Sequence, residues 1–360
     1  MSAGSKTKVL IIDDSAVIRH LLTEILNQAD DIEVVGTAQD PIFAKNKVRD
    51  LRPDVITLDV EMPRMDGLSF LEELMKTDPI PVVMVSALTQ KGCETTLRAL
   101  ELGAIDYITK PSIDVSSGVI NLGDEIIKKV RLAAKARVRR KGFECSSVQA
   151  AKELSGKKTS HLTTGTLESL SATTDKIIAI GASTGGTQAI TEIITALPES
   201  TPGTVIVQHM PPVFTSSFAE RLNSISRIDV KEAVSGDRVL RGTALIAPGN
   251  HHMTVKRNGA MYYVDIIDGP MVNFVRPSVD VLFRSVAKYA GRNAVGVILT
   301  GMGEDGARGM LEMKEAGAFT IAQDEASSVV FGMPKRAIEL GAADRVISLD
   351  EIAKIILEHA

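Results

Sequence analysis

The chain has 360 residues, whereas a single domain usually has roughly 100 to 200, so we expect two domains. Its 41 basic and 45 acidic residues give a net charge of -4, which lacks the basic excess of a nucleic-acid-binding domain. Two cysteines, Cys93 and Cys145, are too few for a disulfide framework and lack the CxxC spacing of a zinc site. No apolar run fits a signal peptide or a membrane span, so we expect a cytoplasmic protein.

From residue 8, short apolar runs alternate with amphipathic helical patterns. The runs are VLIID, IEVVGTA, DVITLD, PVVMVS and IDYITK, and a helical pattern follows each of them, the last near residues 121 to 138. This alternation is typical of a parallel sheet covered by helices. It predicts a first α/β domain of five strands and five helices, which we assign to residues 1–130.

The periodic pattern fails after the last of these helices. Residues 131–175 are expected to be a helix end followed by a flexible linker, because the segment is rich in Ser, Thr, Lys and Gly. Residues 128–141 carry many Lys and Arg and no acid. We interpret this run as a solvated helix end, with a docking surface for an acidic partner as the alternative.

The alternation resumes at residue 176 and continues to the C-terminus. Strands are expected at IIAIGAS, TVIVQH, TALIAPGN, AVGVILTG and FTIAQ. Helices are expected after Gly186, at FAERLNSI, over 278–290, from about 305 and at the C-terminus. Asn258-Gly259 between two alternating runs predicts a β-hairpin. Residues 176–360 therefore form a second doubly wound α/β domain with a hairpin insertion.

Polar side chains follow four strands of the first domain. Asp13 and Asp14 follow the first strand, Asp59 the third, Ser86 the fourth and Lys110 the fifth. The carboxyl ends of parallel strands share one rim, where three carboxylates would repel one another without a cation. Oxygen ligands suit Mg²⁺. Beside it, Asp59 could attack a phosphoryl donor whose oxygens Ser86 and Lys110 bind.

IDDS, LDVEMPRMDG, VSA and ITKP resemble the response-regulator receiver domain, over residues 8 to about 130. The resemblance implies a flavodoxin-like five-stranded sheet. It also implies a phosphorylation site, Asp59, a set of Mg²⁺ ligands, Asp13, Asp14 and Asp59, and two phosphoryl contacts, Ser86 and Lys110. Tyr107 takes the place of the aromatic residue that reports activation in that family.

The stretch IGASTGG places Ser183 in a GxSxG turn after a strand of the second domain. A nucleotide-binding turn is one interpretation, but GASTGG lacks the second glycine of GxGxxG, and no GK[ST] follows. A serine nucleophile needs a base and an orienting acid at the same rim. His209 ends the next strand, and Glu304 and Asp305 follow a later one. The residues favour a triad of Ser183, His209 and one of these two acids.

IGASTGG, VIVQHMP, APGNHHM and LTGMGEDGA resemble the catalytic domain of the chemotaxis protein-glutamate methylesterases, from residue 176 to the C-terminus. With a receiver in front, the whole chain resembles this family. The site residues that the resemblance implies are the nucleophile Ser183, the base His209, the acid Asp305, and Thr184 and Met302 at the oxyanion hole. The implied reactions are hydrolysis of glutamyl methyl esters with release of methanol, without a cofactor, and deamidation of glutamines.

The resemblance also implies partners: methylated chemoreceptors as substrate and a chemotaxis histidine kinase as phosphodonor. We expect a location at cytoplasmic chemoreceptor arrays, no nucleic-acid partner and no direct membrane insertion. We further expect the unphosphorylated receiver to pack over the rim that holds Ser183 and His209, and phosphorylation to favour an open arrangement. The rival hypothesis is a response regulator whose second domain only binds a nucleotide or a partner protein.

Overall fold

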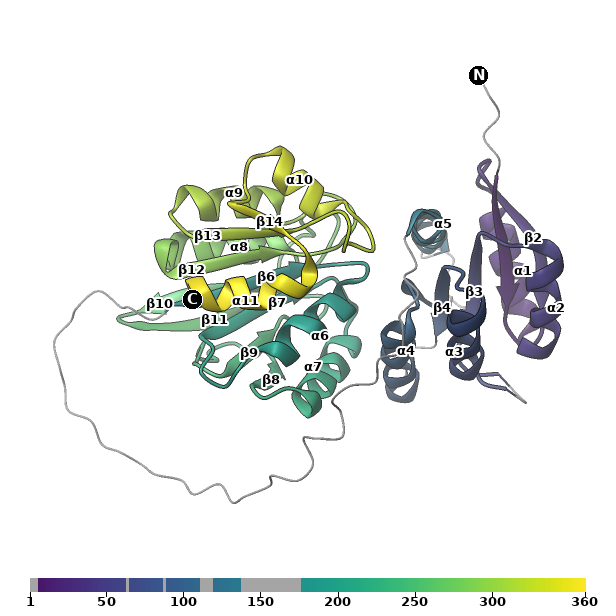
Figure 1. Cartoon of the computed structure of the whole chain (residues 1–360), viewed down its shortest axis with the longest axis horizontal. Helices are drawn as coiled ribbons and strands as arrows, with labels where there is room; N and C mark the ends of the chain where they lie inside the picture. The colour runs from purple at the N-terminus through teal and green to yellow at the C-terminus, as the bar shows by residue number, and fades with distance from the viewer. Residues whose placement is uncertain (1–5, 63–64, 87–88, 111–118, 137–175) are drawn as a thin grey trace, which may run out of the picture.

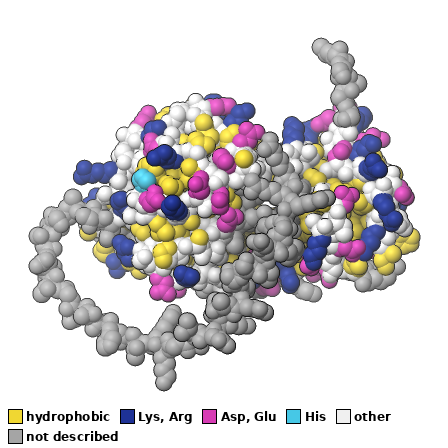
Figure 2. Space-filling model, in the orientation of Figure 1, with side chains coloured by type: hydrophobic (Ala, Val, Ile, Leu, Met, Phe, Trp, Pro, Cys, Tyr) yellow, Lys and Arg dark blue, Asp and Glu magenta, His cyan; other side chains and the backbone are white. Residues whose placement is uncertain are grey.

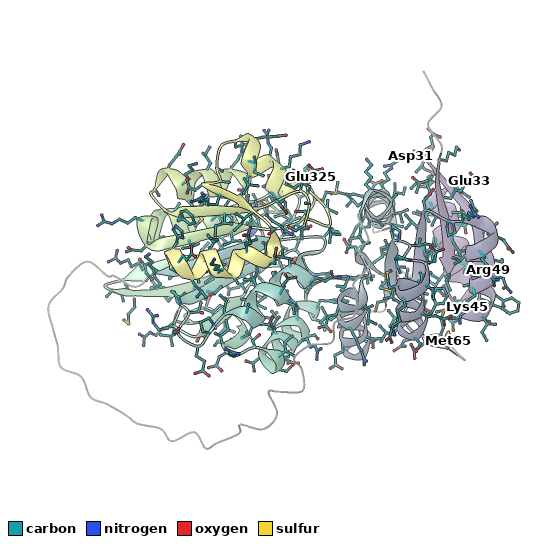
Figure 3. The ribbon with its side chains drawn as sticks, in the orientation of Figure 1. Asp31, Glu33, Lys45, Arg49, Met65 and Glu325 are labelled. Carbon is teal, nitrogen blue, oxygen red and sulfur yellow. The ribbon has the colours of Figure 1, made fainter. Side chains whose placement is uncertain are left out.

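The computed structural model describes residues 6–62, 65–86, 89–110, 119–136 and 176–360, which form two α/β domains lying side by side (Figure 1). Helix α4 of the first domain packs against α6 and α7 of the second. The side chains of Lys45 and Arg49 lie on the opposite side of the first domain (Figure 3). Basic and acidic side chains are mixed over the face of both domains seen in Figure 2, in keeping with the small net charge.

The first domain is a five-stranded parallel sheet in the order β2-β1-β3-β4-β5. Its strands are β1 Thr7–Ile12, β2 Ile32–Ala38, β3 Val55–Asp59, β4 Val82–Ser86 and β5 Asp106–Thr109. Its helices are α1 Ala16–Leu26, α2 Pro41–Leu51, α3 Gly67–Thr77, α4 Gln90–Leu102 and α5 Val119–Lys135. This strand order is the flavodoxin-like one, which confirms the predicted fold.

Local sequence explains where these elements begin. Every residue of β3 and β4 is buried, as expected for strands covered by helices on both faces. Four helices start at a side-chain cap, where an oxygen accepts a backbone N–H of the first turn. These caps are Ser15, Asp40, Asp66 and Thr89. Each capped helix runs back across the sheet, so the next strand starts at the same edge. The carboxyl ends of the strands therefore lie together at the opposite edge.

The second domain is a seven-stranded parallel sheet in the order β14-β13-β12-β6-β7-β9-β8. Its strands are β6 Ile177–Ala182, β7 Gly203–Gln208, β8 Asp229–Glu232, β9 Thr243–Ile246, β12 Ala294–Ile298, β13 Phe319–Gln323 and β14 Arg345–Ile347. Its helices are α6 Gly186–Ala196, α7 Phe214–Ile225, α8 Val279–Tyr289, α9 Ala307–Glu315, α10 Met333–Glu339 and α11 Leu349–His359. The predicted hairpin consists of β10 His252–Asn258 and β11 Met261–Ile267.

The strand order of this sheet changes direction at β6. From β6 the chain builds β7, the edge strand β8 and then β9 between them on one side, and it later returns to build β12, β13 and β14 on the other. Ligands of open α/β sheets bind at the carboxyl ends of the strands next to such a switch point. The turn after β6, which contains Ser183, lies at this position.

Candidate functional sites

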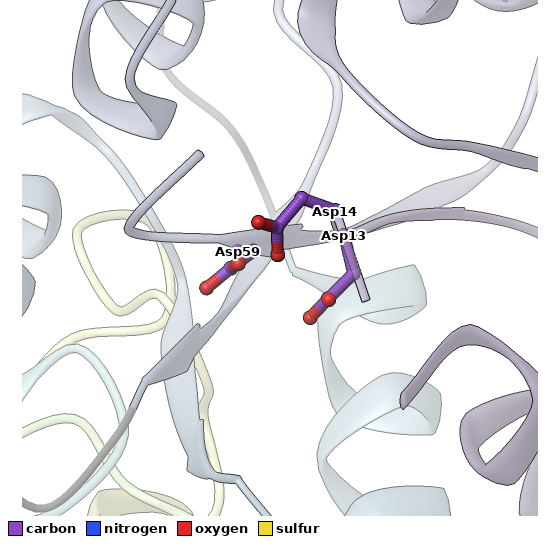
Figure 4. A group of neighbouring side chains, drawn as sticks. All are labelled: Asp13, Asp14 and Asp59. Carbon is purple, nitrogen blue, oxygen red and sulfur yellow. The ribbon is translucent and has the colours of Figure 1, made fainter. Parts of the chain in front are cut away.

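The acidic cluster of the first domain consists of Asp13, Asp14 and Asp59 (Figure 4), with carboxylate oxygens within 4.8 Å of one another. Asp13 and Asp59 are buried and Asp14 is exposed. Lys110 Nζ lies 2.8 Å from Asp59 Oδ1 and 3.5 Å from Asp13 Oδ2. Ser86 is buried at the end of β4, one residue after Val85, the register partner of Asp59. The structure thus brings together the five residues that the strand ends predicted.

Burial dominates the electrostatics of this cluster. It raises the pKa of Asp59 to about 6; the neighbouring Lys110 opposes this rise and the charge of Asp13 adds to it. Burial also raises the pKa of Asp13. Within the described residues, Asp13 Oδ2 and Asp59 Oδ2 are buried oxygens that accept no hydrogen bond. These two buried carboxylate oxygens, one of them 3.5 Å from the Lys110 ammonium group, lie beside an exposed third carboxylate. This arrangement fits a small hydrated cation such as Mg²⁺.

Ser183 and His209 stand at the ends of neighbouring strands in the second domain. Ala182 and Gln208 are register partners of β6 and β7, and His209 N donates to Ala182 O at 3.1 Å. The turn is held on both sides, because Ser183 N donates to Thr300 O at 3.0 Å and Gln208 Nε2 donates to Ser183 O at 2.9 Å. The Ser183 hydroxyl makes no hydrogen bond inside the described ranges.

Two glycines let the backbone fit around Ser183. Gly185 has a φ of +76°, and a Cβ there would lie 2.6 Å from Val329 Cβ. A Cβ on Gly301 would lie 2.7 Å from Ser183 Cβ. Because a larger residue would collide at either position, packing around Ser183 requires both Gly185, the second glycine of the GxSxG pattern, and Gly301 from the loop after β12.

His209 contacts one of the two candidate acids. His209 Nε2 lies 2.9 Å from Asp305 Oδ2, and both side chains are largely buried. Glu304 instead pairs with Arg336 at 3.3 Å and is half exposed. Burial raises the pKa of Asp305, but hydrogen bonds and charge from His209 and further bonds from Asn273 and Ser278 outweigh it, so the pKa lies below its usual value. Asp305 is therefore ionised at neutral pH and can orient an imidazole.

Sequence reasoning missed the residues that hold Asp305. Its Oδ1 accepts hydrogen bonds from Asn273 Nδ2 and Ser278 Oγ, both at 2.7 Å, and its Oδ2 accepts one from Val279 N at 2.6 Å. Ser278 is the N-cap of α8, so the carboxylate sits at the positive end of that helix. The N-cap pattern was a signal for Ser278, but no sequence motif links Asn273 to an acid 32 residues later.

Thr184 and Met302 flank Ser183 in space. Thr184 O accepts a hydrogen bond from Thr300 Oγ1 at 3.0 Å, which fixes the backbone just after Ser183. Met302 follows Gly301, the residue packed on Ser183, and is partly buried. Both backbones therefore lie at the same rim as the serine, where α6 also begins.

The first domain packs directly against this rim. Thr184 Oγ1 donates to Asp106 Oδ2 of β5 at 2.7 Å, and Gln188 Nε2 donates to Leu100 O. The Tyr107 and Phe214 rings stack with centroids 4.4 Å apart. Arg221 of α7 also donates hydrogen bonds to both carboxylate oxygens of Glu101 of α4, at 3.0 and 3.1 Å.

Known proteins resemble the chain along nearly all of its length. A family model described as response regulator receiver domain matches residues 9–116, and one described as CheB methylesterase matches residues 178–356. A protein-glutamate methylesterase/protein-glutamine glutaminase of Geobacter metallireducens is 57% identical over 96% of this chain and 94% of that protein. The chain belongs to the CheB methylesterase family.

Two further members of this family show the same agreement. A Salmonella typhimurium protein-glutamate methylesterase/protein-glutamine glutaminase is 56% identical over 98% of this chain and 97% of its own length. The crystal structure of the Thermotoga maritima CheB methylesterase catalytic domain superposes with a TM-score of 0.50 at 42% identity and covers 51% of this chain and 98% of that one. The second sheet of our chain therefore has the fold of a CheB catalytic domain.

Two other sequence expectations concern surfaces. Within the basic run 128–141, Lys129 pairs with Asp106 at 3.3 Å and Arg131 with Asp31 at 2.6 Å, while residues 137–141 lie outside the described residues. These contacts tie α5 to its own domain.

Among the described helices, none combines the length and apolar character that crossing a membrane requires.

Proposed function

We propose that this chain is a receiver-regulated esterase that hydrolyses glutamyl methyl esters of chemoreceptors and releases methanol. One observation carries the proposal: Ser183 and His209 stand at adjacent strand ends, and His209 is hydrogen-bonded to the buried, ionised Asp305. Membership of a family whose relatives are named for this activity supports it. Their names also support glutamine deamidation as a second activity, since an amide passes through an equivalent tetrahedral intermediate.

Each side chain has one role in the proposed mechanism. His209 Nε2–H donates a hydrogen bond to the Asp305 carboxylate, which leaves Nδ1 free to take the proton of Ser183 as its oxygen attacks the ester carbonyl. Backbone N–H groups of Thr184 and Met302 stabilise the oxyanion. Collapse of the intermediate expels methanol, which receives its proton from His209. Water then attacks the acyl-enzyme, with His209 again as base, and releases the glutamate carboxylate and free Ser183.

The receiver half supplies the regulation. We assign phosphorylation to Asp59, Mg²⁺ ligation to Asp13, Asp14 and Asp59, and phosphoryl contacts to Ser86 and Lys110, with a chemotaxis histidine kinase as donor. A bound Mg²⁺ neutralises charge on the transferred phosphoryl group. Lys110 already contacts Asp59 and ends the segment that begins with Asp106 and Tyr107, which touch the catalytic domain. A change at Asp59 can therefore reach the domain interface through Lys110, which is only three residues from Tyr107 along the chain.

In the arrangement described here the receiver covers the turn that carries the nucleophile. Asp106 holds Thr184, the residue after Ser183, and Val329 next to Gly185 packs against the receiver core. A protein substrate must displace this contact to reach Ser183. We therefore assign residues 1–130 to an inhibitory receiver, 131–175 to a helix end and linker, and 176–360 to the esterase, in an enzyme that acts at cytoplasmic chemoreceptor arrays.

The test compares methanol release from carboxyl-methylated chemoreceptor membranes by the wild type, Ser183→Ala and Ser224→Ala. Ser224 lies exposed on α7 and serves as a matched control. We expect Ser183→Ala to lose at least about 10⁴-fold in rate, as other triad enzymes do, and Ser224→Ala to match the wild type. Release by Ser183→Ala at the wild-type rate would exclude Ser183 as the nucleophile, and no release by any of the three proteins would support the rival hypothesis that the second domain only binds.

A further inference from the structure

A tight hairpin turn lies next to Asp305. Val272 N and Val275 N each donate to the carbonyl oxygen of the other residue at 3.1 Å, so Asn273 and Phe274 form a two-residue loop. Both loop residues have positive φ, 53° for Asn273 and 64° for Phe274. This combination is that of type I′ turns, in which Asn is common at the first position and Gly at the second. A phenylalanine at the second position strains the backbone.

Asn273 ties this turn to the proposed triad. Its Nδ2 donates to Asp305 Oδ1 at 2.7 Å and to Asp280 Oδ2 at 2.9 Å, so its two N–H bonds serve two buried carboxylates. Asp305 in turn contacts His209. The position of Phe274, one residue further, is therefore fixed relative to the site of ester hydrolysis.

The phenylalanine side chain gains nothing from the fold in return for this strain. It is 95% exposed, and Met271 in the same loop is 62% exposed. Residues with a strained backbone persist where the surrounding structure fixes them, as the hydrogen bonds of Asn273 do here, and they cluster at active sites and ligand-binding sites. An isolated exposed apolar residue needs no explanation, but this one combines strain, exposure and a hydrogen-bonded connection to the triad acid.

A second strained apolar residue lies on the neighbouring loop. Val213 follows His209 by four residues, has a φ of 73° and is 44% exposed. The two loops are linked by residues 249–250: a Cβ on Gly249 would lie 2.3 Å from Pro212 N, and Asn250 N donates to Arg276 O at 3.2 Å. Val213, Met271 and Phe274 therefore lie on connected loops, one of which follows His209 while the other is bonded to Asp305 through Asn273. We call these three exposed residues the apolar rim.

We propose that this apolar rim, and Phe274 above all, binds the segment of the substrate protein that flanks the esterified glutamate. We identify the bound segment from the position of the loops. When the glutamate ester of a substrate protein reacts with Ser183, the residues on either side of that glutamate lie near these loops. The inference rests on the proposed function and deepens it: Ser183, His209 and Asp305 cleave the ester, whereas Phe274 selects a protein substrate over a small ester. The contact is apolar, so the flanking side chains that it favours are apolar.

Replacing Phe274 by glycine separates strain from binding. Phe274→Gly suits the positive φ, so we expect its melting temperature to be higher than that of the wild type. With phosphodonor and Mg²⁺ present, we expect its KM for methylated chemoreceptor membranes to rise about tenfold, the effect of losing one buried phenylalanine contact, at nearly unchanged kcat. Its kcat/KM for a blocked glutamate γ-methyl ester should remain within about twofold of the wild type.

Met261→Ala is the matched control, because Met261 is also an exposed apolar hairpin residue but lies at the amino ends of β6 and β7, opposite Ser183. An unchanged KM for chemoreceptors in Phe274→Gly would overturn the proposal. So would an equal loss on the small ester, since that result assigns Phe274 a structural role. A different result would contradict the proposed function itself: full activity of Ser183→Ala on both the chemoreceptor membranes and the small ester.

Discussion

At the scale of single residues, Asp59 lies in an environment that disfavours its charged form. The folded protein buries it beside Asp13 and raises its pKa from 3.8 to about 6, burial being the largest cause. A raised pKa means that the native state holds the proton more tightly than the unfolded chain does. The stability from this group is thus complete below the ordinary value of 3.8 and is lost as the pH rises through about 6. The loss amounts to roughly 3 kcal/mol at most.

This environment predicts how Asp59→Asn changes with pH. Without divalent cations, the free energy of unfolding of Asp59→Asn relative to the wild type should increase from pH 4 to pH 8, because asparagine has no charge to bury. Urea unfolding of both proteins across this range measures the difference, with the exposed Asp50→Asn on α2 as control. A difference that does not change with pH would show that burial of Asp59 does not destabilise the ionised form.

The same scale shows what the sequence could reveal about the sites. The residues of the acidic cluster and those of the triad follow strands, so the alternation of apolar runs was enough to bring them to shared rims. Asn273 could not be predicted in this way. Its contact with Asp305 depends on the φ values of a two-residue turn and on the approach of that turn to α8, which no spacing in the sequence encodes.

At the scale of secondary structure, the sequence predicted those elements whose buried residues form an apolar run or a helical repeat. Buried strands such as β6 and β12 appear as continuous apolar runs and were predicted. The edge strands β8, with the sequence DVKE, and β14, with RVI, were missed because edge strands are short and carry exposed polar residues. Helix α10 was also missed, since its seven residues span only two turns.

The contact between α4 and α7 offers a test by charge exchange. Glu101→Arg places a like charge against Arg221 and should raise the basal esterase rate roughly threefold, because a partly exposed pair is worth at most about 1 kcal/mol. Adding Arg221→Glu restores the opposite pairing and should return the rate to the wild-type level. Glu73→Arg, which breaks the pair with Lys45 on the far side of the receiver, serves as control (Figure 3). If Glu73→Arg raised the basal esterase rate as much as Glu101→Arg does, the Glu101–Arg221 pair would have no specific part in the inhibition.

At the scale of the whole molecule, two domains of similar fold divide the chemistry. In both, the proposed reactive side chains lie at the carboxyl rim of a parallel sheet. Asp106 and Tyr107, the first two residues of β5, join the receiver to Thr184 and Phe214 of the second domain. In the proposed function, a receiver over the catalytic turn keeps basal hydrolysis low. We propose that charge added at Asp59 on β3, two strands away from these contacts on β5, shifts the equilibrium between covered and open arrangements.

The most direct test of a receiver-gated esterase is methanol release from methylated chemoreceptor membranes before and after addition of a small phosphodonor with Mg²⁺. The wild type should be stimulated, Asp59→Asn should keep its basal rate without stimulation, and Ser183→Ala should be inactive under both conditions. Stimulation of Asp59→Asn to the same extent as the wild type would contradict the account, because phosphoryl transfer to Asp59 would then not control access to Ser183.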